Sequence, residues 1–138
     1  MPHRSFSKIY LHITWHTKEN RPLIDQKSLK SLQQLVRIRC EIEREVQFIT
    51  FGGYQNYVHL AVKIPPTLNI SKWIGEIKGY TSHELTTRTQ TKQFSWQEGY
   101  GVVSFSSRDF NMIVNYVENQ EEHHQSNNLF DNLEKITE

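Results

Sequence analysis

The sequence predicts an α+β fold in which helices cover one antiparallel sheet. Four segments have the alternating or continuously apolar side chains that are typical of strands. In three others, apolar side chains recur every three to four residues, as in amphipathic helices. These segments follow one another in the order β-α-β-β-α-β, with the third helix at the C-terminal side. A chain of 138 residues without an internal repeat has the length of one domain, so residues 1–138 are treated as a single domain.

The chain begins with a predicted strand and a predicted helix. Over residues 7–17, Ile, Leu and Trp alternate with Tyr, His and Thr, the two-residue period of a half-buried strand. Asp25 is a good N-cap residue, and apolar side chains recur at helical spacing over residues 26–43. We therefore expect this helix to pack one apolar face against the sheet.

A hairpin and a second helix are expected next. Residues 46–51 and 57–64 have strand composition, and Gly52-Gly53 between them is a turn signal. Pro65-Pro66 ends the second of these strands, because proline cannot continue the hydrogen-bonded ladder. Asn69 is expected to cap a helix whose apolar stripe extends to Leu85.

The last predicted elements are a short strand and a helix. A polar stretch over 86–93 leads to the strand at 102–106. Ser106 to Asp109 resemble a capping box, which predicts a helix over about 107–125 before an acidic tail over about 126–138. The complete order is the split βαβ arrangement of ferredoxin-like folds, plus a C-terminal helix. Both internal helices should lie on one face of the sheet and leave the other face free as a site surface.

Charge is distributed unevenly along the chain, although the net charge is +1. Residues 1–110 carry 15 basic and nine acidic side chains, a net +6, and residues 111–138 carry one basic and six acidic, a net −5. The small net charge of the whole chain therefore does not exclude a nucleic-acid partner for residues 1–110. The single Cys40 excludes an internal disulfide, and no apolar segment approaches the ~20 residues of a membrane span. Without an apolar signal segment, a cytoplasmic protein is expected.

Polar residues that could carry chemistry lie on the third strand and the last helix. Strand alternation places Tyr57 and His59 opposite the apolar face, and Tyr116 and Gln120 are neighbours on the helix. Spacing alone favours ordinary roles. His59 would be a surface histidine, and Tyr116 would lie at the edge of the apolar stripe with its hydroxyl in water. The segment 121–124, Glu-Glu-His-His, would be a solvated helix end.

Five segments of the chain occur in the same order in one protein family. They are residues 17–23, 52–60, 78–79, 96–101 and 116–124. In these segments the chain resembles the small single-tyrosine HUH transposases of the insertion-sequence two-hundred type and their REP-associated relatives. The resemblance runs from about Ile9 to Leu133. The tyrosine-x-x-x-glutamine helix and the tryptophan-to-glycine block are fairly specific when they occur together.

The resemblance implies a reaction on single-stranded DNA. Members of the family cut DNA at insertion-sequence ends with one tyrosine, which forms a 5′-phosphotyrosine link and frees a 3′-hydroxyl; by position this nucleophile is Tyr116. Strand joining then needs no ATP. A divalent metal, Mg²⁺ or Mn²⁺, is held in the family by a His-hydrophobic-His motif and the helix glutamine, and the matching residues are His59 and Gln120. The family's functional unit is a homodimer in which the tyrosine helix can complete the partner's site.

The sequence departs from the family at the first histidine of the motif, which is Tyr57. A neutral phenol is a weak ligand for Mg²⁺ or Mn²⁺. Three explanations stay open. The metal is held weakly by His59, Gln120 and water; or His12, which is adjacent if the first and third strands pair, is a substitute ligand; or cleavage is lost and DNA binding retained.

Basic side chains among aromatic residues indicate where DNA would bind. The basic side chains suit contacts with phosphates and the aromatic ones suit stacking on bases, although lysines on helix exteriors more commonly just face solvent. The expected partner is single-stranded or hairpin DNA at insertion-sequence or repeat ends. The alternative function is a non-catalytic, domesticated DNA-binding protein. The candidate DNA-binding residues are Lys63, Lys72, Lys78 and Arg88.

Overall fold

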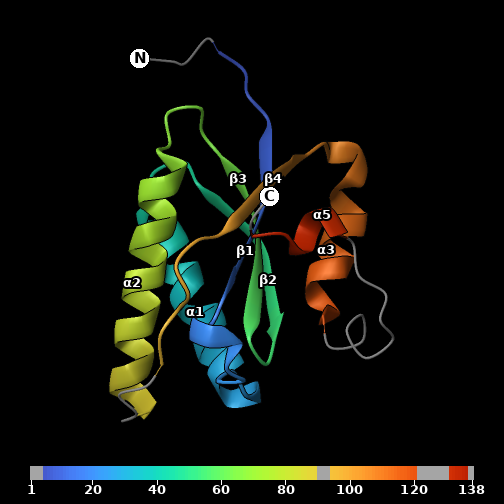
Figure 1. Cartoon of the computed structure of the whole chain (residues 1–138). Coiled ribbons are helices and arrows are strands. Elements are labelled where there is room, and N and C mark those ends of the chain that lie inside the picture. Colours follow the sequence, from blue (N-terminus) through green and yellow to red (C-terminus); the bar gives the residue numbers. More distant parts are fainter. Residues whose placement is uncertain (1–4, 90–93, 121–130, 137–138) are drawn as a thin grey trace.

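A computed structural model describes residues 5–89, 94–120 and 131–136. It confirms the predicted order of elements and shows a further short helix in the C-terminal part (Figure 1). Two short 3₁₀ turns, Lys18–Asn20 and Ser107–Asp109, lie between the main elements. Those elements are β1 (Ile9–His16), α1 (Gln26–Ile42), β2 (Gln47–Tyr54), β3 (Tyr57–Ile64), α2 (Ile70–Thr89), β4 (Gly101–Phe105), α3 (Phe110–Glu118) and α5 (Asp131–Glu134).

The four strands form one antiparallel sheet in the order β2-β3-β1-β4. The two central strands, β1 and β3, pair along their whole length, with Thr14 opposite His59 and His16 opposite Tyr57. The pairing that would make His12 a neighbour of the third strand is therefore confirmed. This antiparallel α+β arrangement is the predicted fold class.

Helices α1 and α2 cover one face of the sheet (Figure 1). Asp25 caps α1 as predicted, because its side chain accepts a hydrogen bond from the Ser28 amide at 2.7 Å. At the start of α2, the Asn69 side chain accepts a hydrogen bond from the Lys72 amide at 3.2 Å. The buried residues of this face are apolar and include Leu11, Ile13, Trp15, Leu32, Val36, Leu60, Val62, Trp73, Ile74 and Ile77.

Two boundary predictions before β4 are wrong. Gly52 and Gly53 lie inside β2 rather than in the turn, which falls at Gln55-Asn56. The glycine is needed for packing, since a Cβ at Gly52 would lie 2.0 Å from the backbone oxygen of Val117 in α3. Helix α2 continues to Thr89, so the first part of the predicted polar stretch 86–93 is helical; residues 90–93 lie outside the described part.

The start of the third helix also differs from the prediction. Neither Ser106 nor Asp109 makes a side-chain cap hydrogen bond, and a 3₁₀ turn precedes α3. The capping box is therefore absent at this end. Residues 121–130 and 137–138 lie outside the described part of the chain, including the predicted helix end near 125 and the segment 121–124.

The second face of the sheet is covered by α3 and α5, so the prediction of a free face is wrong (Figure 1). Leu133 of α5 is buried, although the sequence suggested an acidic tail there. This face has a small apolar cluster of its own, made of Ala61, Ile113, Tyr116, Val117 and Leu133. The covered face is where the candidate residues meet.

Candidate functional site

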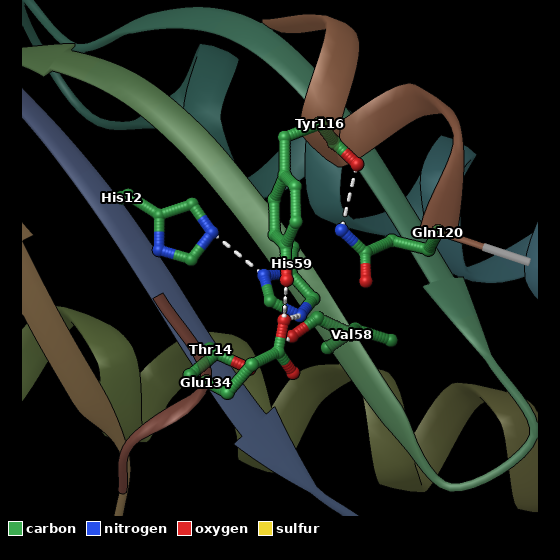
Figure 2. A network of polar contacts seen from close by, with 7 residues as sticks. All are labelled: His12, Thr14, Val58, His59, Tyr116, Gln120 and Glu134. Atoms are coloured by element: carbon green, nitrogen blue, oxygen red, sulfur yellow. Dashed lines mark hydrogen bonds and ion pairs between the residues drawn. The ribbon is translucent and has the colours of Figure 1, made fainter. Parts of the chain in front are cut away.

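Two histidines on adjacent strands form the centre of the site. His12 of β1 and His59 of β3 lie on the face covered by α3, and both are almost fully buried. The Nε2 atom of His12 lies 2.6 Å from Nδ1 of His59, so one ring donates a hydrogen bond to the other (Figure 2). The alternation that predicted a shared face thus places both imidazoles together.

Both imidazoles are neutral at pH 7. Burial, together with the nearby His59, lowers the pKa of His12 to about 3. Burial also lowers the pKa of His59, while the Glu134 carboxylate acts in the opposite direction. The 3.4 Å approach of His59 Nε2 to Glu134 Oε2 is consequently a contact between a neutral ring and a carboxylate rather than an ion pair.

Tyr116 points into this site from α3. Its side chain is 1% exposed, and its hydroxyl donates a hydrogen bond to the Glu134 carboxylate, so the expectation of a hydroxyl in water is wrong. The Tyr116 ring meets the His59 ring edge to face with centroids 5.9 Å apart. Figure 2 shows Tyr116, His59 and Glu134 converging. The proposed nucleophile and the candidate metal-binding histidine are therefore neighbours.

Gln120 folds back on its own helix. Its Nε2 donates to the backbone oxygen of Tyr116 at 2.7 Å (Figure 2). Its Oε1 is buried and has no hydrogen-bond partner among the described residues, and the same holds for Nε2 of His59. Buried polar atoms normally have partners, so these two need an explanation.

Tyr57 stands where the family resemblance implies the first histidine of the motif. It is buried, and its ring lies 5.2 Å from the His59 ring and 5.9 Å from the His16 ring, centroid to centroid. Burial, reinforced by the charge of Glu134, raises the pKa of the Tyr57 phenol well above its ordinary value. The phenol is therefore neutral at pH 7.

The donor set around His59 fits a divalent cation. Among the described residues no group of three or more His, Cys, Asp or Glu side chains is arranged to bind metal, so a site here has to include another donor type. The amide oxygen of Gln120 is such a donor and is unpaired. Imidazole nitrogen, amide oxygen and carboxylate oxygen together suit ions such as Mn²⁺.

The candidate DNA-binding residues are not gathered at this site. Lys63 lies at the end of β3, on the same face as His59 by strand alternation. Lys72, Lys78 and Arg88 belong to α2 on the opposite face. Lys78 is half-buried and its Nζ donates to the backbone oxygens of Gln97 and Gly99 at 2.8 and 2.9 Å, so it connects α2 to the segment before β4.

Comparison with known proteins decides the family. The sequence profile of the family described as transposase, IS200 like, matches residues 5–120. The chain belongs to this transposase family. The resemblance drawn from the motifs is thereby confirmed. Comparison with curated proteins gives no significant match. No helix in the described part of this transposase-family chain is long and apolar enough to cross a membrane.

Two solved structures share the fold of this family member. One is the crystal structure of a candidate transposase from Deinococcus radiodurans R1, with 20% identity and a TM-score of 0.66. The match covers 87% of this chain and 96% of that one. The other is a REP-associated tyrosine transposase bound to a REP hairpin, with 15% identity and a TM-score of 0.62, covering 90% of this chain and 73% of that one.

Glu134 is the site residue that sequence reasoning missed. It lies on a four-residue helix, α5, whose length is too short for a periodic pattern. The available signal was the set of apolar residues in the tail over 126–138, Leu133 among them, which indicates docking onto the fold. This signal does not say which carboxylate would reach Tyr116, because that depends on contacts between residues distant in sequence.

Proposed function

We propose that the chain binds single-stranded hairpin DNA and cleaves and rejoins it through Tyr116. The observation that carries this proposal is the convergence of the Tyr116 hydroxyl with His59 and Glu134, in a member of a transposase family. A buried phenol beside an imidazole and a carboxylate is rare in an ordinary apolar core. The arrangement suits covalent catalysis by a tyrosine nucleophile.

The chemistry conserves the energy of the cut bond. The Tyr116 oxygen forms a bond to the phosphorus of the DNA backbone, and the bond from phosphorus to the 3′ oxygen breaks. The phenol loses one proton and the 3′ oxygen gains one, so the proton count is unchanged. A bound divalent cation would polarise the phosphate, and His59 and Gln120 are the residues that would hold it. Reversal of the same step rejoins the strand without ATP.

The chain's own residues position the nucleophile. Glu134 holds the Tyr116 hydroxyl through a hydrogen bond, and Gln120 binds the backbone oxygen of the same residue. The close approach of Gly52 to Val117 fixes α3 against β2. These contacts restrict the directions from which a phosphate can reach the hydroxyl.

Hairpin DNA and a second copy of the chain complete the proposal. One structural neighbour is a transposase bound to a REP hairpin, which supports hairpin DNA as the substrate class for this chain. A homodimer is proposed because the family resemblance implies it. Lys63 is the candidate phosphate contact on the site face, and Lys72, Lys78 and Arg88 would contact DNA that extends around α2.

A covalent-adduct experiment tests the nucleophile. The protein is incubated with single-stranded hairpin DNA and Mn²⁺, and a band of higher mass is sought on a denaturing gel. We expect an adduct from the unchanged protein and none from Tyr116→Phe. Tyr80→Phe, a change on α2 at the opposite face, is the matched control and should keep the adduct. An adduct that persists in Tyr116→Phe would show that another residue is the nucleophile.

A second candidate function is DNA binding without cleavage, and Tyr57 favours it. The neutral, buried phenol replaces a metal-binding imidazole, so the site has one fewer strong ligand. This candidate predicts salt-sensitive binding of hairpin DNA with no adduct. It also predicts that Tyr57→His makes the adduct appear.

A further inference from the structure

A carboxylate reaches the proposed site from a part of the chain beyond the family match. Glu134 is the last residue of α5, and the profile match ends at residue 120. One oxygen of its carboxylate accepts the hydrogen bond of Tyr116 and lies 3.4 Å from Nε2 of His59. The side chain is 19% exposed, so solvent screens it only partly.

Two contacts hold α5 where Glu134 can enter the site. Leu133 is 6% exposed and joins the apolar cluster that includes Val117 of α3. On the other side, the backbone of α5 lies against β4. A Cβ added at Gly101 would be 1.8 Å from the backbone oxygen of Lys135, so only glycine permits this approach. Glu134 is therefore placed by a fitted interface rather than by a loose tail.

Two buried polar atoms of the proposed site are short of hydrogen-bond partners. Nε2 of His59 and Oε1 of Gln120 are buried without hydrogen bonds among the described residues. The 3.4 Å separation of His59 Nε2 from Glu134 Oε2 exceeds a good hydrogen bond. It is close to the roughly 3 Å that separates adjacent ligands of an octahedral cation with bonds of about 2.1 Å. A cation bound by Nε2 of His59 and the Glu134 carboxylate would account for this approach, and the buried Oε1 of Gln120 is a further oxygen donor in the proposed site.

His12 fits a supporting role for such a cation. Metal-binding histidines commonly donate their second ring N–H to a neighbour, which fixes the ring and its tautomer. Nδ1 of His59 lies 2.6 Å from Nε2 of His12, so His59 can donate there and leave Nε2 as a free lone pair. His12 then orients the ligand instead of binding the ion through that nitrogen.

We propose that Glu134 is the third protein ligand of a divalent-cation site with His59 and Gln120, in place of the imidazole that Tyr57 lacks. The carboxylate has further lone pairs with which it can accept the Tyr116 hydrogen bond while it binds the ion. The inference rests on the proposed function for the site's role, but it concerns ion binding, which is measured without DNA.

The test is a titration of the purified chain with Mn²⁺, followed by the electron paramagnetic resonance signal of the free ion. Glu134→Gln keeps the size of the side chain and removes its charge. We expect it to weaken Mn²⁺ binding by about 10- to 100-fold. Glu41→Gln, which removes an exposed carboxylate from α1 on the opposite face, should change the affinity less than about twofold.

Two further variants separate ligand loss from misfolding. Gly101→Ala leaves Glu134 unchanged but displaces α5 and should weaken Mn²⁺ binding to a similar extent, with thermal melting as the check on folding. Adding Tyr57→His to Glu134→Gln should restore the affinity, because it supplies the imidazole that the family motif has. Recovery of this kind is not expected if Glu134 only supports the fold.

The outcomes distinguish this inference from the proposed function. Mn²⁺ affinity of Glu134→Gln within about twofold of the unchanged protein would overturn the inference. An increase in DNA adduct for that variant at unchanged Mn²⁺ affinity would also overturn it, because the carboxylate would then occupy the place of the phosphate. Glu134-dependent Mn²⁺ binding without any adduct on hairpin DNA would sustain the inference and reject cleavage.

Discussion

The two faces of the sheet are built from different kinds of residue. The face under α1 and α2 buries a continuous apolar core, with Leu60 and Ile13 fully inaccessible. The face under α3 and α5 has a small apolar cluster and buries His12 and His59 beside it. Buried apolar area stabilises the fold, whereas buried polar groups without complete hydrogen bonding reduce stability. The difference indicates that the first face supplies most of the stability, whereas the second face accommodates polar groups at a cost in stability.

The largest loss of stability is expected from a substitution on the apolar face. Leu60 and His59 are consecutive in β3 and point to opposite faces. Leu60→Ala should lower the free energy of unfolding by about 2–5 kcal/mol, because a buried leucine loses its contacts and leaves a cavity. Urea denaturation followed by circular dichroism measures this. A loss below about 1 kcal/mol would contradict the assignment of stability to this face.

A smaller loss of stability is expected from a substitution where α3 meets the sheet. Gly52→Ala should cost about 1–3 kcal/mol, since the added Cβ would collide with the Val117 backbone oxygen. The same variant should reduce DNA adduct, because α3 carries Tyr116. Gly75→Ala is the matched control in α2, where nothing lies within 4 Å of the added Cβ, and it should raise stability by about 0.5–1 kcal/mol. Equal losses in both variants would mean that α3 is not fitted to Gly52.

The helix cap at Asp25 should contribute about 1 kcal/mol. The hydrogen bond from Ser28 lowers the pKa of the Asp25 carboxyl below its ordinary 3.8. A folded-state pKa below the unfolded one gives stability that is present above pH 3.8 and is lost as the pH falls through the folded value. The stability difference between the unchanged protein and Asp25→Ala should therefore hold from pH 7 to 5 and shrink below about pH 4. A difference that grows on acidification would contradict this sign.

The smallest change in stability is expected for removing the polar pair of the second face. Replacing both histidines, His12→Leu with His59→Leu, should leave the free energy of unfolding within about 1 kcal/mol of the unchanged protein, or raise it. The His59→Leu single variant should be less stable than the double, because it leaves buried His12 without its partner. Mn²⁺ binding should be lost in both. A double variant less stable than the single would show that the pair stabilises the fold.

Most of the fold could be predicted because its signals are local. The range of β3 was predicted at both ends, since the alternation begins at Tyr57 and Pro65 stops it. The start of α1 follows from Asp25, whose cap hydrogen bond is made within four residues. Where the signal was ambiguous, the prediction was wrong. Gly52-Gly53 is also a common turn sequence, and only the approach of α3 explains its place inside a strand.

The site was predictable only in part, because its remaining contacts depend on tertiary structure. Strand alternation placed His59 on the correct face, and strand pairing placed His12 beside it. Helical spacing put Tyr116 next to Gln120, but its hydroxyl meets Glu134, which no local pattern connects to it. Lys78 stays a candidate for DNA contact, but its charge did not predict its role in the fold. Its ammonium group donates hydrogen bonds to two backbone oxygens, and burial lowers its pKa.

The meeting of His12, His59 and Glu134 has a consequence for the order of folding. Residues 12 and 134 are 122 positions apart in the sequence, and closing such a long loop is entropically costly until the intervening elements are in place. The apolar face can form from β1, α1 and the β2–β3 hairpin, whose residues are much closer together. Refolding should therefore regain secondary structure and the tryptophan core first. The proposed cation binding should return later, with the docking of α5 as the slow step.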